Sequence, residues 1–121
     1  VQTITLDEIV EQHKINPSLV KIDCEGFEKI ILTGGSHLLE SMRPTFMIEC
    51  NDNALKLAGT NRIELFKLLH YFDYKLFHLA SFSGGYPLGI TCDENFPASE
   101  FNFTAVPNDD INLARWHRSI K

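Results

Sequence analysis

The sequence has few cysteines, no concentration of positive charge and no long apolar run. Its three cysteines, Cys24, Cys50 and Cys92, are an odd number at wide spacing, which indicates neither a disulfide framework nor a zinc knuckle. A formal charge of -5 without a Lys/Arg run argues against nucleic acid or an anionic membrane as the main partner. No segment approaches the roughly 20 apolar residues of a membrane span, and no leader opens the chain. These absences predict a reducing, cytoplasmic compartment.

The length and the hydrophobic content fit one soluble globular unit. With 121 residues, 44% of them hydrophobic, the chain is long enough for one core and too short for two. Because the chain begins with Val1 rather than methionine, we expect it to be a piece of a longer protein.

The most informative stretch of the sequence is residues 19–28. An apolar run rich in β-formers, residues 19–22, ends in Asp23 and Glu25, and a glycine and an apolar-periodic segment follow directly. This order predicts a strand, a tight turn and a helix from about Phe27 to Thr33. Ligands of an open α/β sheet bind beyond the carboxyl ends of its strands, so Asp23 and Glu25 are the first candidates for a reactive site.

A second strand repeats this pattern. Residues 45–50 are mostly apolar, and Glu49 lies near their end. Two strands joined by a helical crossover form a right-handed βαβ unit, which predicts a parallel pair with Asp23 and Glu49 at the same end. Glu28 follows Glu25 at the start of the predicted helix. The candidate site residues are therefore four carboxylates: Asp23, Glu25, Glu28 and Glu49.

Further elements are predicted on both sides of these strands. Residues 1–5 have strand character, and a capping box of Thr5 and Glu8 begins a helix that ends near His13. Gly34-Gly35 predicts a left-handed helix cap. The other predicted elements are a helical piece at 36–42, an amphipathic helix at 61–72, strands at 74–79 and 101–106, and a helix after residue 109. Residues 80–100 show no period.

Several ordered motifs resemble the FkbM family of S-adenosylmethionine-dependent methyltransferases. The motifs are Thr5-Leu6-Asp7, Lys21-Ile22-Asp23-Cys24-Glu25-Gly26-Phe27-Glu28, Leu32-Thr33-Gly34-Gly35, and Arg43-Pro44 leading into Met47-Ile48-Glu49. The likeness is close as far as Glu49 and looser over the later strands.

The resemblance implies an α/β fold, namely part of a Rossmann-like methyltransferase sheet that is mixed because its last strand is antiparallel, with helices on both faces. Residues 19–22, 45–49, 74–79 and 103–106 would be the fourth to seventh strands, with the seventh between the fifth and the sixth. The first three strands, which normally carry the glycine-rich cofactor turn, would be absent, and no G-x-G-x-x-G spacing occurs. Residues 1–121 would then be the C-terminal part of a single domain without its cofactor-binding half.

The activity that the resemblance implies is methyl transfer from S-adenosylmethionine to a small molecule or saccharide, with a hydroxyl oxygen as the expected acceptor. Asp23 is the first candidate for the base that takes the hydroxyl proton, and Glu25 stands beside it in that role. Glu28 and Glu49 would position the acceptor. Which residues contact the cofactor is unknown, and the fragment would be inactive alone.

Three other interpretations of these residues stay open. Glu25 and Glu28 can instead stabilise a helix start, where acidic side chains cap free N–H groups and complement the helix dipole. Asp23, Glu25 and Glu49 could serve a metal-dependent hydrolase. Asp23, Glu25 and Glu28 could also hold Mg or Ca, but their spacing matches no dedicated loop for a divalent ion, so a divalent metal is not favoured and no metal site is predicted. A non-catalytic unit could pair through the apolar edge of residues 19–22 in a homodimer.

Overall fold

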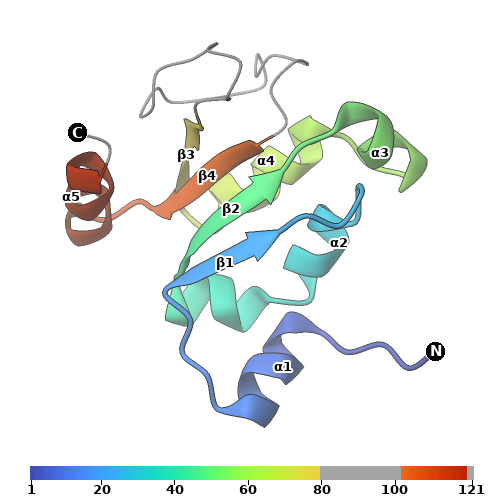
Figure 1. The fold of residues 1–121 in the computed structure, drawn as a ribbon, viewed down its shortest axis with the longest axis horizontal. Coiled ribbons are helices and arrows are strands. Elements are labelled where there is room, and N and C mark those ends of the chain that lie inside the picture. Colours follow the sequence, from blue (N-terminus) through green and yellow to red (C-terminus); the bar gives the residue numbers. More distant parts are fainter. Residues whose placement is uncertain (80–101, 120–121) are drawn as a thin grey trace.

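The fold is known from a computed structural model that describes residues 1–79 and 102–119 (Figure 1). The strands of this part, β1 (Leu19–Ile22), β2 (Thr45–Glu49), β3 (Tyr74–His78) and β4 (Asn102–Pro107), form one open sheet in the order β1-β2-β4-β3. β1 and β2 are parallel, whereas β4 is antiparallel to both of its neighbours. The mixed α/β sheet and the insertion of the last strand are thereby confirmed. The prediction for residues 80–100 lies outside the described residues.

The helices surround this sheet. They are α1 (Leu6–His13), α2 (Glu28–Thr33), the π-type turn η1 (Leu38–Met42), α3 (Asp52–Leu57), α4 (Arg62–Tyr71) and α5 (Asp110–Ser119). The capping box of α1 is confirmed, because the Thr5 hydroxyl accepts from the Glu8 N–H at 3.2 Å and the Glu8 carboxylate accepts from the Thr5 N–H at 2.7 Å. None of the helices in the described ranges has the length and apolar character needed to cross a bilayer.

The main core lies on one face of the sheet. Side chains alternate between faces along a strand, and the buried Phe46 and Ile48 of β2 therefore share a face with Ala105 and Phe103, their partners on β4. α4 covers this face, and its Phe66 ring packs edge-on against Phe103 with centroids 4.9 Å apart. On the opposite face, Phe77 of β3 packs against Trp116 of α5 at 5.5 Å. Helices therefore cover both faces, as expected.

Two local predictions are wrong. Residues 1–5 form no strand and are exposed, because the sheet begins at β1 and offers them no neighbour. Gly34 has a φ of -81° rather than a left-handed conformation. The glycines permit close packing instead, since an added Cβ would lie 3.1 Å from Thr5 Cβ at Gly34 and 3.1 Å from Leu6 Cδ1 at Gly35.

Two residues from the motifs that carry the family resemblance, Asp7 and Arg43, have structural roles. The Asp7 carboxylate accepts hydrogen bonds from the backbone N–H groups of His37 and Leu38, both at 2.9 Å, so α1 holds the start of η1. The Arg43 guanidinium donates to the carbonyl oxygens of Phe72 and Asp73, both at 2.8 Å. Arg43 thus joins the entry of β2 to the turn before β3.

Candidate active site

The candidate site lies at the carboxyl ends of β1 and β2. Their parallel register pairs Ile22 with Ile48, so the residues that follow, Asp23 just after β1 and Glu49 at the end of β2, lie at the same level. Because the carboxyl ends of parallel strands share one edge of a sheet, the predicted approach of these two side chains is confirmed.

Three of the four predicted carboxylates converge at this edge. Asp23, Glu25 and Glu49 each offer one carboxylate oxygen within 4.8 Å of the others. Asp23 and Glu25 are exposed, whereas Glu49 is half-buried. Lys21 lies nearby, with its Nζ 3.9 Å from an Asp23 oxygen, but both side chains are largely in solvent and their attraction is weak. The cluster therefore keeps an excess of negative charge.

The Glu49 carboxyl has a raised pKa. Burial raises its pKa to about 7, helped by a hydrogen bond with the Asp23 carboxyl and by the negative charges of Asp23, Glu25 and Glu28. Its Oε2 is buried and has no hydrogen-bond partner among the described residues. A carboxyl group with such a pKa can take or give a proton near neutral pH.

Glu28 lies beneath the turn rather than in the cluster. Its side chain is 1% exposed, and its Oε1 accepts from the backbone N–H groups of Cys24 at 3.0 Å and Gly26 at 3.2 Å. These bonds hold the turn in which Glu25 has a φ of 54°. Cys24 and Gly26 precede α2, so Glu28 caps the turn before the helix rather than N–H groups of the helix itself, and its contact with an acceptor stays a prediction.

Gly26 allows the β1–α2 turn to pack closely against α3. Its φ is 99°, and an added Cβ would lie 2.2 Å from the Ala54 carbonyl oxygen. α3 was not predicted from the sequence, although Asn51, which accepts from the N–H groups of Asn53 and Ala54, is a typical helix cap and could have indicated it. The turn that carries Glu25 therefore packs against α3, the helix that follows β2 in the chain.

The β1–α2 turn does not fit S-adenosylmethionine, the cofactor that the resemblance implies. A cradle for such a cofactor needs a glycine-rich turn with free N–H groups. At the β1–α2 turn, the backbone of Ala54 fills the space beside Gly26, and Glu28 takes the N–H groups of Cys24 and Gly26. This turn therefore offers no cradle for the cofactor and instead presents carboxylates.

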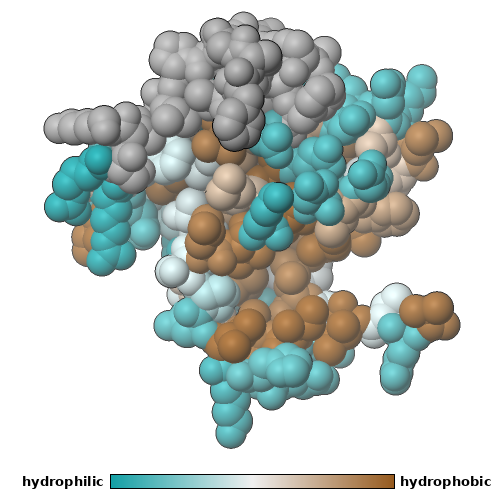
Figure 2. Space-filling view, in the orientation of Figure 1, coloured by the Kyte–Doolittle hydropathy of each residue, from teal (hydrophilic) through white to brown (hydrophobic). Residues whose placement is uncertain are grey.

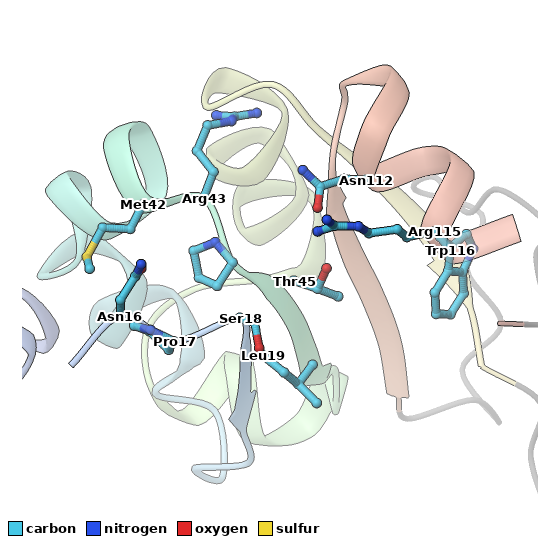
Figure 3. Close-up of a pocket in the computed structure, with 11 residues that line it drawn as sticks. Asn16, Pro17, Ser18, Leu19, Met42, Arg43, Thr45, Asn112, Arg115 and Trp116 are labelled. Carbon is cyan, nitrogen blue, oxygen red and sulfur yellow. The ribbon is translucent and has the colours of Figure 1, made fainter. Parts of the chain in front are cut away.

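A separate hollow of about 520 Å³ lies at the amino ends of β1 and β2 (Figure 3). Arg115 and Trp116 of α5 approach it from one side, and Thr45 and Pro17 line it from the strand ends. No carboxylate belongs to its described lining. This hollow is thus at the opposite end of the strands from the candidate site.

The geometry allows the carboxylate cluster to accept hydrogen bonds from a polar ligand and to take up one proton. The same three oxygens lie close enough together to hold a divalent cation, which prefers carboxylate ligands. An open α/β sheet with carboxylates at the ends of a parallel strand pair is consistent with part of a Rossmann-like fold.

The family follows from comparison with known proteins. The family model of the methyltransferase FkbM domain matches residues 1–76, and the chain belongs to this family. The matched range includes all four candidate carboxylates, but β4 and α5 lie beyond it. No match was found among curated proteins or among solved structures.

Proposed function

We propose that this chain is the acceptor-binding, C-terminal part of a methyltransferase domain that transfers a methyl group from S-adenosylmethionine to a hydroxyl oxygen of a small molecule or saccharide. The observation that carries the proposal is the meeting of Asp23, Glu25 and Glu49 at one edge of the sheet, with the pKa of Glu49 raised to about 7. Family membership supports the reaction class.

We expect the three carboxylates to have different roles, because their surroundings differ. A hydroxyl oxygen becomes a better nucleophile when its proton is removed, and a base with a pKa near the working pH removes it best. Asp23 and Glu49 act as that base together, since their carboxylate oxygens lie within 4.8 Å of each other and the raised pKa of Glu49 lets this carboxyl hold a proton near neutral pH. The exposed Glu25 accepts hydrogen bonds from neighbouring hydroxyls and so orients the acceptor.

The cofactor supplies the methyl group and is bound by residues outside those described. We therefore expect the chain alone to be inactive and the acceptor to bind without the cofactor. The test is carboxyl ¹³C NMR of the purified chain during titration with monosaccharides and small alcohols, and separately with S-adenosylmethionine and with magnesium.

The expected result is saturable shifts of the Asp23, Glu25 and Glu49 signals with at least one hydroxyl ligand, and loss of that binding in Asp23→Asn and Glu49→Gln. Glu40→Gln, which changes an exposed carboxylate on η1, is the matched control and should bind as the wild type does. Saturable binding of S-adenosylmethionine would refute the expected division between acceptor and cofactor sites. Magnesium binding with no effect of hydroxyl ligands would favour the metal-dependent hydrolase.

A further inference from the structure

Strand pairing brings a further polar residue to the level of the candidate site. Glu49 is the register partner of Asn102, the first residue of β4, and Asp23 lies at the level of Glu49 on its other side. Side chains of register partners share one face of a sheet, with their Cβ atoms about 5 Å apart. Asp23, Glu49 and Asn102 therefore form a row across three neighbouring strands, and the start of β4 lies beside the end of β2 in Figure 1.

The sheet face around Asn102 has hydrogen-bonding groups that are not in use. The Asn102 side chain is exposed and has no hydrogen-bond partner among the described residues. Thr104, two residues further along the same face, is 1% exposed, and within residues 1–79 and 102–119 its Oγ1 has no partner either. Native proteins leave few buried hydroxyls unpaired, so this face is suited to a polar ligand. Figure 2 shows hydrophilic residues gathered between the carboxyl ends of β1 and β2 and α3.

Asn102 supplies a hydrogen-bond donor, which the ionised carboxylates lack. An ionised carboxylate only accepts hydrogen bonds, whereas a side-chain amide both donates and accepts. A hydroxyl that donates its proton to Asp23 and Glu49 leaves the Asn102 amide available for a second oxygen of the same ligand. Because neighbouring strands lie about 4.8 Å apart, the row suits two oxygens on adjacent carbon atoms better than two at opposite ends of a ring.

We propose that Asn102 is a further acceptor-binding residue, which selects acceptors with two neighbouring hydroxyls, as in a saccharide. The first hydroxyl binds at Asp23 and Glu49, and the second binds the Asn102 amide. This inference rests on the proposed function, because it takes the row as part of the acceptor site. Asn102 lies beyond residues 1–76, the range that the family model matches, so family membership does not assign it this role.

The test compares alcohols that share one ring: cis- and trans-1,2-cyclohexanediol, trans-1,4-cyclohexanediol and cyclohexanol. Binding to the full chain is followed by the carboxyl ¹³C signals of Asp23 and Glu49 and by the side-chain amide ¹⁵N signal of Asn102. At least one 1,2-diol should bind about fivefold more tightly than cyclohexanol, the effect of one further hydrogen bond, and should shift the Asn102 signal. The 1,4-diol has as many hydroxyls but should gain no comparable affinity.

Asn102→Ala should reduce the affinity for the 1,2-diol to that for cyclohexanol and leave cyclohexanol binding unchanged, whereas loss of a merely structural role would weaken both. Asn16→Ala, which changes an exposed asparagine at the opposite end of the strands, is the matched control and should keep the preference. Circular dichroism checks the folding of each variant.

The outcomes separate this inference from the proposed function. Carboxyl shifts of equal strength with all the alcohols overturn the role of Asn102 but leave the proposed function standing. A preference for 1,2-diols that survives Asn102→Ala also overturns this role. Absence of carboxyl shifts with every alcohol would contradict both the role of Asn102 and the proposed function.

Discussion

The raised pKa of the Glu49 carboxyl couples its proton to folding. Its pKa is about 7 in the folded state and near 4.5 otherwise, so between these values the folded state binds more protons than the unfolded chain. The free energy of unfolding should therefore fall as the pH rises through this window. Glu49→Gln should remove this fall, which is on the order of 1 kcal/mol after allowance for solvent screening.

Urea denaturation at pH 5 and pH 8 measures this difference. Glu40→Gln serves as the control and should keep the wild-type pH dependence, since Glu40 is exposed on η1. Equal pH dependence in the wild type and in Glu49→Gln would show that the Glu49 carboxyl does not titrate with a raised pKa.

Gly26 offers a second test at the scale of one residue. Gly26→Ala introduces a Cβ at a φ of 99° and 2.2 Å from the Ala54 carbonyl oxygen. We expect it to lower the free energy of unfolding by about 2–4 kcal/mol, from backbone strain and overpacking together. Gly59→Ala separates the two causes, because Gly59 has a φ of 81° and nothing within 4 Å of its added Cβ.

The control should lose only about 1 kcal/mol, the cost of strain alone. Thermal unfolding of both variants measures the difference. Equal losses would mean that α3 moves away from Gly26 at little cost.

The candidate site could be predicted in part from single residues. The approach of Asp23 and Glu49 follows from strand direction alone, because Asp23 directly follows β1 and Glu49 is the last residue of the parallel β2. The role of Glu28 could not be predicted in the same way. Whether a carboxylate at a helix start points to solvent or back to its own turn depends on the burial that neighbouring elements impose.

At the scale of elements, Asp7 joins α1 to η1. Asp7→Ala leaves the N–H groups of His37 and Leu38 without their carboxylate acceptor. We expect a loss of about 1–2 kcal/mol in the free energy of unfolding, as for other helix caps. Glu11→Ala, an exposed change on the same helix, should cost much less. A chemical denaturation series compares the two variants, and similar losses would show that the bonds of Asp7 contribute little.

Elements with strong local signals were predicted well, and those that depend on distant partners were not. The capping box of Thr5 and Glu8 begins α1 where expected, since both bonds lie within one turn. Residues 1–5 were predicted as a strand from their composition, but a strand also needs a neighbouring strand, which local pattern does not supply. The short α3 was missed because its polar start resembles a loop.

At the scale of the whole molecule, strand order came from the resemblance to a family rather than from the pattern of residues. β4 pairs with both β2 and β3, although it lies far from β2 in the chain. The alternation predicted at residues 101–106 indicates a strand but does not select its neighbours. The packing of Phe66 against Phe103 shows how α4 and β4 complete one core.

Cys50 reports on the integrity of that core, and Cys24 provides an internal control. Cys50 is 1% exposed and belongs to a core cluster that extends from α1 to β4. Burial also raises the pKa of its thiol to about 12, so the reactive thiolate is scarce at pH 8.

In a Cys92→Ser background, iodoacetamide should modify the exposed Cys24 in native buffer, whereas Cys50 should react only as urea unfolds the whole domain. Peptide mass spectrometry across a urea series measures both rates. Coincidence of the Cys50 labelling midpoint with the loss of circular dichroism would mean that the sheet opens as one cooperative unit. Labelling of Cys50 at lower urea would mean instead that the carboxyl end of β2, and with it the carboxylate cluster, opens independently of the rest of the sheet.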